Sequence, residues 1–85
     1  MKKWFVYILQ CSDGTLYTGI TTDVNRRLNE HNSGKGAKYT RNRTPVMLMA
    51  VSEAGSRSEA SKEEYYIKQL PKLEKIKYII NKKQN

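Results

Sequence analysis

The sequence lacks most of the residues on which disulfide-bonded, zinc-bound and membrane proteins depend. Its 85 residues include one cysteine and one histidine, which excludes an intramolecular disulfide and a zinc site made of Cys and His ligands. Cys11 is interpreted as a small filler at a strand end, and this cysteine usage favours a reducing, cytoplasmic compartment. The apolar run after Lys2-Lys3 ends before Gln10 without a small-residue cleavage pattern, so neither a signal peptide nor a membrane partner is expected.

Acidic residues are also scarce, because 8 Asp and Glu stand against 16 Lys and Arg and leave a net charge of +8. The basic residues are densest over 35–43 and 68–83. Such an excess favours a polyanionic partner, usually nucleic acid, over a basic surface that only keeps the protein in solution. The length and the 38% hydrophobic content predict one domain, residues 1–85, with a small core and a monomer as the favoured state.

Residues 4–21 predict a β-hairpin around which the rest of the chain is organised. The run Trp4–Leu9 has the composition of a strand buried on both faces, and Ser12-Asp13-Gly14 is a turn signal closed by a left-handed glycine. Cross-strand partners share a face of a sheet. The resulting register puts four residues on one face: Tyr7, Leu9, Tyr17 and Gly19. The glycine is expected to leave an empty space beside the Tyr7 ring.

The remaining pattern predicts an α+β fold, a three-stranded antiparallel sheet packed with three helices in the order β-β-α-β-α-α. The most apolar strand, the first, should lie in the middle and give the strand order 2-1-3. The strands are expected at about 3–11, 15–21 and 46–52, and the helices near 23–33, 57–69 and 72–82. Met47 and Met49 are expected to fill the core, and the last helix is expected to bury Leu73, Ile76 and Ile80.

Functional side chains concentrate in the first helix and the loop that follows it. Arg27 and His31 are i, i+4 neighbours beside the apolar stripe of the helix. Cations interleaved with one aromatic residue suit phosphate contact combined with stacking, although a solvated loop is the alternative. The loop over 34–45 supplies five candidate nucleic-acid-binding residues: Lys35, Lys38, Tyr39, Arg41 and Arg43.

One carboxylate interrupts the apolar stripe of the second helix. Ser56 and Glu59 form a capping box, and Glu63 is expected to point outward. Glu64 shares its face with Ala60 and Ile67, where an isolated carboxylate is costly unless it is paired or binds a cation. The sequence leaves both explanations open, a structural ion pair with a neighbouring Arg or Lys and a metal ligand.

Taken together, these residues resemble the GIY-YIG nuclease family over nearly the whole chain. The two name motifs correspond to Phe5-Val6-Tyr7 and Tyr17-Thr18-Gly19, and the match continues in order through Arg27, His31 and Glu64. The segment 34–41 is also similar to small stand-alone bacterial members. The first motif keeps only its tyrosine, the second has Thr18 in place of isoleucine, and no residue is assigned to the late asparagine of larger members.

The resemblance implies hydrolysis of a phosphodiester bond. Glu64 would hold one divalent ion, Mg²⁺ or Mn²⁺, because hard cations prefer oxygen ligands. Arg27 would bind the non-bridging phosphate oxygens. Tyr7 is implied as the general base or water-positioning group, with Tyr17 orienting water or phosphate. His31 is the alternative base, since its intrinsic pKa suits neutral pH.

Three classes of function compete for this sequence. The leading hypothesis is a metal-dependent endonuclease, with DNA as the favoured substrate and a role in DNA repair or processing. The second is a basic module on the same scaffold that binds nucleic acid without cutting it. The third, a protein-interaction adaptor, has no need of the +8 charge.

Overall fold

The computed structural model describes residues 2–84 of the chain. Three strands and three helices follow in the predicted order β-β-α-β-α-α. The strands are β1 (Trp4–Gln10), β2 (Leu16–Thr21) and β3 (Met47–Ala54), and the helices are α1 (Val24–Asn32), α2 (Arg57–Lys68) and α3 (Lys72–Gln84). Their bounds differ from the predicted ones by at most two residues. Among these residues, no helix combines the length and the apolar character needed to cross a membrane.

The sheet is antiparallel with the strand order β2-β1-β3, which confirms the α+β prediction. The hairpin register is also confirmed, because Leu9 pairs with Tyr17 and Tyr7 pairs with Gly19. The backbone N–H of Cys11 donates to the carbonyl of Thr15 at 2.8 Å and closes the turn over 12–14. Gly14 has φ +85°, the left-handed conformation that this turn requires.

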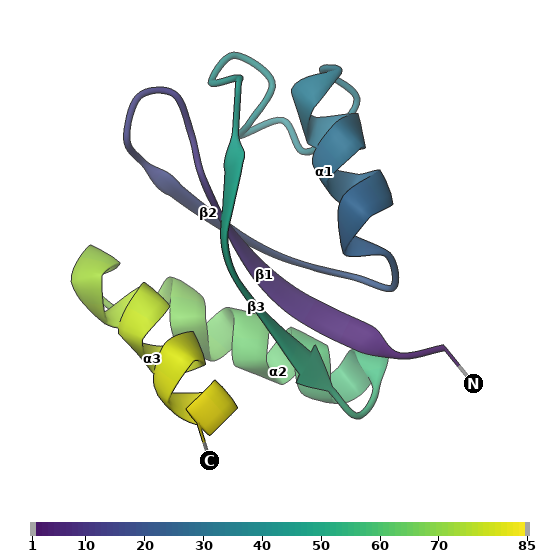
Figure 1. Ribbon diagram of the computed structural model, residues 1–85, viewed down its shortest axis with the longest axis vertical. Coiled ribbons are helices and arrows are strands. Elements are labelled where there is room, and N and C mark those ends of the chain that lie inside the picture. Colours follow the sequence, from purple (N-terminus) through teal and green to yellow (C-terminus); the bar gives the residue numbers. More distant parts are fainter. Residues whose placement is uncertain (1, 85) are drawn as a thin grey trace.

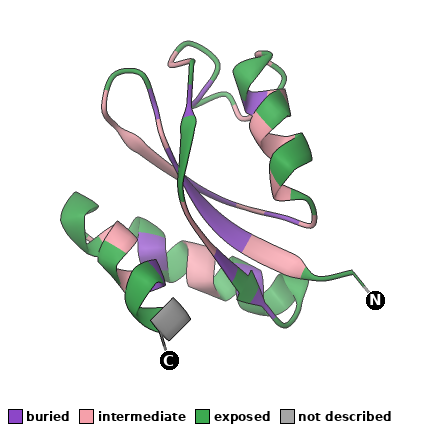
Figure 2. Cartoon of the chain, in the orientation of Figure 1, coloured by how far each residue is buried: buried purple, intermediate pink, exposed green. Residues whose placement is uncertain are grey.

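Helices cover both faces of the sheet, with α1 on one side and the pair α2 and α3 on the other (Figure 1). Side chains alternate along β1, so this central strand supplies both cores, and its middle is buried in Figure 2. The core under α2 and α3 contains Val6, Ile8, Ala54, Ala60, Ile67 and Ile79. The core on the α1 side contains Tyr7, Leu9, Cys11 and Val46, with Tyr17, Leu28 and Val51 packed against it.

The expectation that Met47 and Met49 fill the core is wrong. Met47 is 62% exposed and Met49 is 38% exposed. The pairing of β1 with β3 shifts between Ile8 and Leu9, where β3 carries one extra residue, and such a bulge re-aims the side chains around it. The first half of β3 therefore lies outside the covered part of the sheet, as Figure 2 shows.

Expectations about two helices also need correction. In α3, Ile76 packs against the core as expected, but Leu73 and Ile80 are 75% and 45% exposed, and Ile79 is buried in their place. Glu63 does not point outward, because its side chain is only 10% exposed and forms an ion pair with Lys82 of α3. Its second oxygen, Oε1, is buried without a hydrogen-bond partner among the residues described. This ion pair joins α2 to α3.

Side-chain caps begin both α1 and α2, and the one at α2 is the predicted capping box of Ser56 and Glu59. Asp23 accepts a hydrogen bond from the N–H of Arg26 at the start of α1, and Gly34 follows the helix with φ +82°. At the start of α2 the Ser56 hydroxyl accepts from the N–H of Glu59, whose carboxylate accepts from the N–H of Gly55. These caps fix where α1 presents Arg27 and His31, and where α2 presents Glu64.

Candidate active site

Three aromatic rings meet on the α1 side of the sheet. The ring centroids of Tyr7 and Tyr17 are 6.4 Å apart, and that of His31 lies 5.9 Å from Tyr7 and 5.2 Å from Tyr17. The predicted empty space beside Tyr7 does not exist, because the tyrosine itself fills it. A Cβ on Gly19 would lie 2.5 Å from the Tyr7 hydroxyl oxygen and 2.7 Å from Cζ. Glycine is thus required here so that the Tyr7 ring can cross β2.

A chain of buried hydrogen bonds runs inward from the Tyr7 hydroxyl. The Thr40 hydroxyl donates its single proton to the carbonyl of Ala37 at 3.0 Å, so it accepts from His31 Nδ1–H at 2.7 Å. The neutral imidazole then carries its lone pair on Nε2, which accepts from the Tyr7 hydroxyl at 2.9 Å. His31 and Thr40 are both fully buried. The bonds therefore fix the His31 tautomer and the direction of the Tyr7 hydroxyl.

The protonation states of these groups follow from their surroundings. Burial lowers the pKa of His31, and the nearby Arg27 charge lowers it further. The imidazole is therefore neutral at pH 7. Burial raises the pKa of Tyr7 to about 12, although a hydrogen bond with Arg27 opposes this rise. In the free protein, Tyr7 is a protonated phenol whose hydroxyl is directed at a neutral acceptor.

Arg27 lies at the rim of this cluster with a partner of its own. Its Nη1 is 3.0 Å from Glu30 Oε1, and this hydrogen bond raises the pKa of the guanidinium. The side chain is 29% exposed, so part of the guanidinium faces solvent. Arg27 is therefore a permanent cation beside the Tyr7 hydroxyl, and its structural partner is Glu30 rather than Glu64.

Glu64 approaches the tyrosines from α2. Its side chain is 21% exposed, and Oε2 lies 3.1 Å from the ammonium of Lys68 one turn later. The carboxylate is close enough to Tyr7 for its charge to raise the pKa of the phenol. Both explanations of this carboxylate are therefore still supported, because Glu64 has a structural partner in Lys68 and is also near enough to Tyr7 to affect its pKa.

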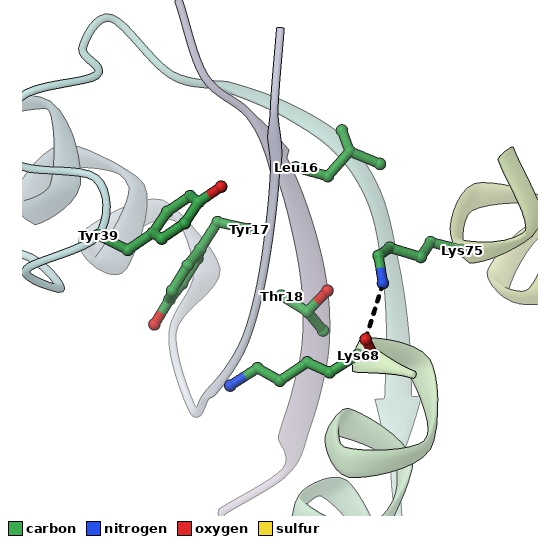
Figure 3. Close-up of a pocket in the computed structure, with 6 residues that line it drawn as sticks. All are labelled: Leu16, Tyr17, Thr18, Tyr39, Lys68 and Lys75. Atoms are coloured by element: carbon green, nitrogen blue, oxygen red, sulfur yellow. Dashed lines mark hydrogen bonds between the residues drawn. The ribbon is translucent and has the colours of Figure 1, made fainter. Parts of the chain in front are cut away.

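A hollow of about 360 Å³, called here the Tyr17–Lys68 hollow, opens beside the cluster. Figure 3 shows the residues that line it, which come from β2, the loop after α1, and the junction of α2 and α3: Leu16, Tyr17, Thr18, Tyr39, Lys68 and Lys75. Tyr39 is 40% exposed and stacks on Tyr17 at 5.8 Å between centroids. The Lys68 ammonium lies 6.0 Å from the Tyr17 ring centroid. The hollow therefore combines aromatic surface with positive charge.

The loop over 34–45 is irregular, as predicted, and its cations differ in their availability. Lys35, Lys38 and Arg41 are all exposed, and none of them takes part in an ion pair among the residues that the structure describes, whereas Arg43 does. Arg43 instead lies 4.2 Å from the centroid of the Tyr39 ring and forms an ion pair with Asp13 at 2.9 Å. Hydrogen bonds from Thr15 lower the pKa of Asp13 to about 2, so its carboxylate stays charged. Arg43 thus fastens the loop to the hairpin turn.

Comparison with known proteins identifies this arrangement. A model of the GIY-YIG catalytic domain matches residues 3–84. The chain belongs to the GIY-YIG family. This is a nuclease family whose members act on nucleic acid and generally use a divalent metal ion. The resemblance carried by Tyr7, Tyr17 and the residues after them is therefore confirmed at the level of the family.

Similar GIY-YIG proteins occur in distant organisms. A UPF0213 protein of Desulfotalea psychrophila is 68% identical over 68 residues, which are 79% of this chain and 62% of that protein. A UPF0213 protein of Halobacterium salinarum is 60% identical over 82% of this chain and 91% of its own length. The solution NMR structure of a protein from E. faecalis covers 100% of this chain and 91% of that one at 41% identity, with a TM-score of 0.68. These names state no activity.

The residues present in this GIY-YIG domain fit a single divalent ion. Among residues 2–84, no group of three or more His, Cys, Asp and Glu side chains converges on one point. Mg²⁺ does not require such a cage, because it keeps several waters and binds through one or two carboxylates together with substrate phosphates. Glu64 is a partly sheltered carboxylate that already holds a cation, the Lys68 ammonium. One carboxylate next to Lys68, which lines the hollow, is compatible with an ion shared with a phosphate.

Sequence reasoning missed three residues of the site. Thr40 orients His31, but it lies in an irregular loop whose course no periodicity predicts. Gly36 belongs to the same contact, because a Cβ there would lie 2.7 Å from His31 Cα. Lys68 could have been found, since a lysine four residues after a glutamate is the usual helical ion-pair spacing.

Proposed function

We propose that this GIY-YIG protein is a metal-dependent endonuclease that hydrolyses phosphodiester bonds, with DNA as the favoured substrate. The observation that carries the proposal is that Tyr7, Tyr17 and His31 lie together, with Arg27 hydrogen-bonded to Tyr7. Glu64 of α2 is near enough for its charge to affect the pKa of Tyr7. A protein that only binds nucleic acid has no need of a buried tyrosine held by a buried neutral histidine. A role in DNA repair or processing is part of the proposal.

Each side chain has a role that its surroundings support. The partly exposed Arg27 guanidinium would bind the non-bridging oxygens of the scissile phosphate with fixed donors. Tyr7 would position the attacking water and take up its proton, while His31 Nε2 receives the proton of the phenol. Tyr17, at the edge of the hollow, would orient the water or the phosphate.

Glu64 is the proposed ligand of one Mg²⁺ or Mn²⁺ ion. When bound, the ion supplies positive charge that polarises the phosphate and stabilises the leaving oxygen. The loop residues Lys35, Lys38 and Arg41 would contact backbone phosphates on either side of the site. Tyr39 would offer its ring on the wall of the hollow, and Arg43, which lies over that ring, would add positive charge beside it.

A non-catalytic nucleic-acid-binding module is the second candidate. The Glu64–Lys68 ion pair favours it, because a carboxylate with a lysine partner has a structural explanation and needs no metal ion. The two candidates agree on the basic loop and on binding. They differ in what Tyr7 and Glu64 contribute.

A cleavage assay separates the two candidates. Labelled single-stranded, duplex and branched DNA, with matched RNA, would be incubated with the protein in Mg²⁺, in Mn²⁺ and in chelator. The proposal expects metal-dependent products that disappear in Tyr7→Phe and Glu64→Gln, while nucleic acid binding persists in both variants. Lys62→Gln, on the exposed side of α2, is the matched control and should cut normally. Binding without products on every substrate would favour the second candidate.

A further inference from the structure

The Lys68 side chain at the end of α2 does not serve the helix carbonyls, as a lysine there commonly does, but pairs with Glu64. Lys68 is the last residue of α2, where cationic side chains commonly serve the free carbonyls of the final turn. Two of those carbonyls are already occupied, because Lys75 Nζ donates to Ile67 at 3.0 Å and to Lys68 at 3.1 Å. The same ammonium also donates to the carbonyl of Leu70, just beyond the helix, at 2.7 Å. The Lys68 side chain is therefore free to turn back one helical turn to Glu64.

The Lys68 ammonium also faces the place where a nucleic acid would lie. Figure 3 shows its side chain extending from the end of α2 toward the side of the hollow on which Tyr17 lies. The lysine side chain is 52% exposed, whereas the Glu64 side chain is 21% exposed. An exposed i, i+4 ion pair is weak, so the ammonium can leave the carboxylate at little cost.

We propose that Lys68 is an internal counter-ion of Glu64 that a divalent cation displaces, and that the displaced ammonium then binds a phosphate of the nucleic acid in the Tyr17–Lys68 hollow. The inference rests on the proposed function, because it takes Glu64 as the ligand of the divalent ion. A divalent ion on Oε2 would repel an ammonium that lies 3.1 Å from that oxygen. A phosphate in the hollow is the anion that the released ammonium can reach.

The first experiment measures Mn²⁺ binding without nucleic acid, by electron paramagnetic resonance of the free ion. Lys68→Gln should bind Mn²⁺ roughly two- to fivefold more tightly than Lys62→Gln, the factor by which an exposed ion pair competes. Lys62 lies on the same helix and is exposed, so both variants lose one charge from α2 and only the local competition differs. Glu64→Gln should abolish the Mn²⁺ site in every background.

The second experiment measures the affinity for a fluorescent oligonucleotide in chelator, by anisotropy. Glu64→Gln should tighten binding, because it frees Lys68 and removes a negative charge. In the Lys68→Gln background, Glu64→Gln should tighten oligonucleotide binding less than it does in the wild type. In the Lys62→Gln background, Glu64→Gln should tighten binding as much as in the wild type. The difference between the two backgrounds isolates the contribution of the released ammonium from the general effect of charge.

The outcomes distinguish this inference from the proposed function. The role of Lys68 would be overturned by two results together. Lys68→Gln and Lys62→Gln would bind Mn²⁺ equally well, and Glu64→Gln would tighten oligonucleotide binding equally in both backgrounds. A Glu64-dependent Mn²⁺ site would in that case leave the proposed function standing. If Glu64→Gln binds Mn²⁺ as the wild type does, Glu64 is not the ligand, and both the inference and the proposed metal site are wrong.

Discussion

Replacement of Thr40 by valine tests the chain of hydrogen bonds behind Tyr7. Valine has nearly the shape of threonine, so the change creates no cavity at a fully buried position. It removes the acceptor that lies 2.7 Å from His31 Nδ1, and His31 is itself inaccessible to water. An unsatisfied buried donor costs about 1–3 kcal/mol. For a domain of this size, each kcal/mol lowers the melting temperature by roughly 4–8 °C.

The measurement combines unfolding in denaturant with ¹⁵N NMR of the imidazole. His31 is the sole histidine of the sequence, so its two ring nitrogens need no further assignment. The wild type should show a protonated Nδ1 and an unprotonated Nε2, and Thr40→Ser should keep that pattern because it keeps the hydroxyl. The reasoning would be refuted by a protonated Nε2 in the neutral wild type, or by a Thr40→Val protein that unfolds within about 0.5 kcal/mol of the wild type.

Three further predictions concern pH, packing and charge. Burial lowers the pKa of His31, so as the pH falls the histidine of the unfolded chain takes up a proton before that of the folded protein. The stability that neutral His31 contributes is therefore complete above about pH 6.5 and is lost as the pH falls through the folded-state pKa. Denaturant titrations should show this loss in the wild type and not in His31→Gln. Gly19→Ala should destabilise the fold by about 1–3 kcal/mol, because its Cβ would lie 2.5 Å from the buried Tyr7 hydroxyl; an unchanged unfolding midpoint would contradict the packing described here. Replacement of Lys35, Lys38 and Arg41 by alanine should weaken binding to all nucleic acid sequences alike. The slope of log affinity against log salt should become shallower by about 1 for each phosphate that is no longer neutralised. Salt-independent binding would exclude an electrostatic interface.

The parts of the fold that the sequence predicts well are those in which local signals agree. The turn over 12–14 fixes which residues of β1 and β2 face each other, and this register alone brings Tyr7 and Tyr17 to one face. The capping box of Ser56 and Glu59 then fixes where the second helix begins. Because these signals are short in range, they survive without knowledge of the tertiary structure.

The parts that were missed depend on contacts between distant segments. Ile79 and Ile80 are adjacent apolar residues, so periodicity alone cannot decide which of them the sheet buries. Glu63 and Glu64 are likewise neighbours, and the position of Lys82 on α3 decides that Glu63 is the more buried one. The exposure of Met47 and Met49 depends on a bulge that the sequence does not announce. Thr40 reaches His31 only because Gly36 lets the loop pass close to α1.

The hydrogen bonds behind Tyr7 also determine where a proton can travel. The chain ends at the carbonyl of Ala37, which accepts a hydrogen bond but cannot take up a proton at neutral pH. A proton that moves from the Tyr7 hydroxyl to His31 Nε2 therefore has no exit on the far side. It must return by the hydrogen bond through which it arrived, while the imidazolium stays next to the Arg27 charge that disfavours it. The hydrogen bonds can therefore hold one proton reversibly, and burial together with the repulsion from Arg27 drives that proton from His31 back to Tyr7.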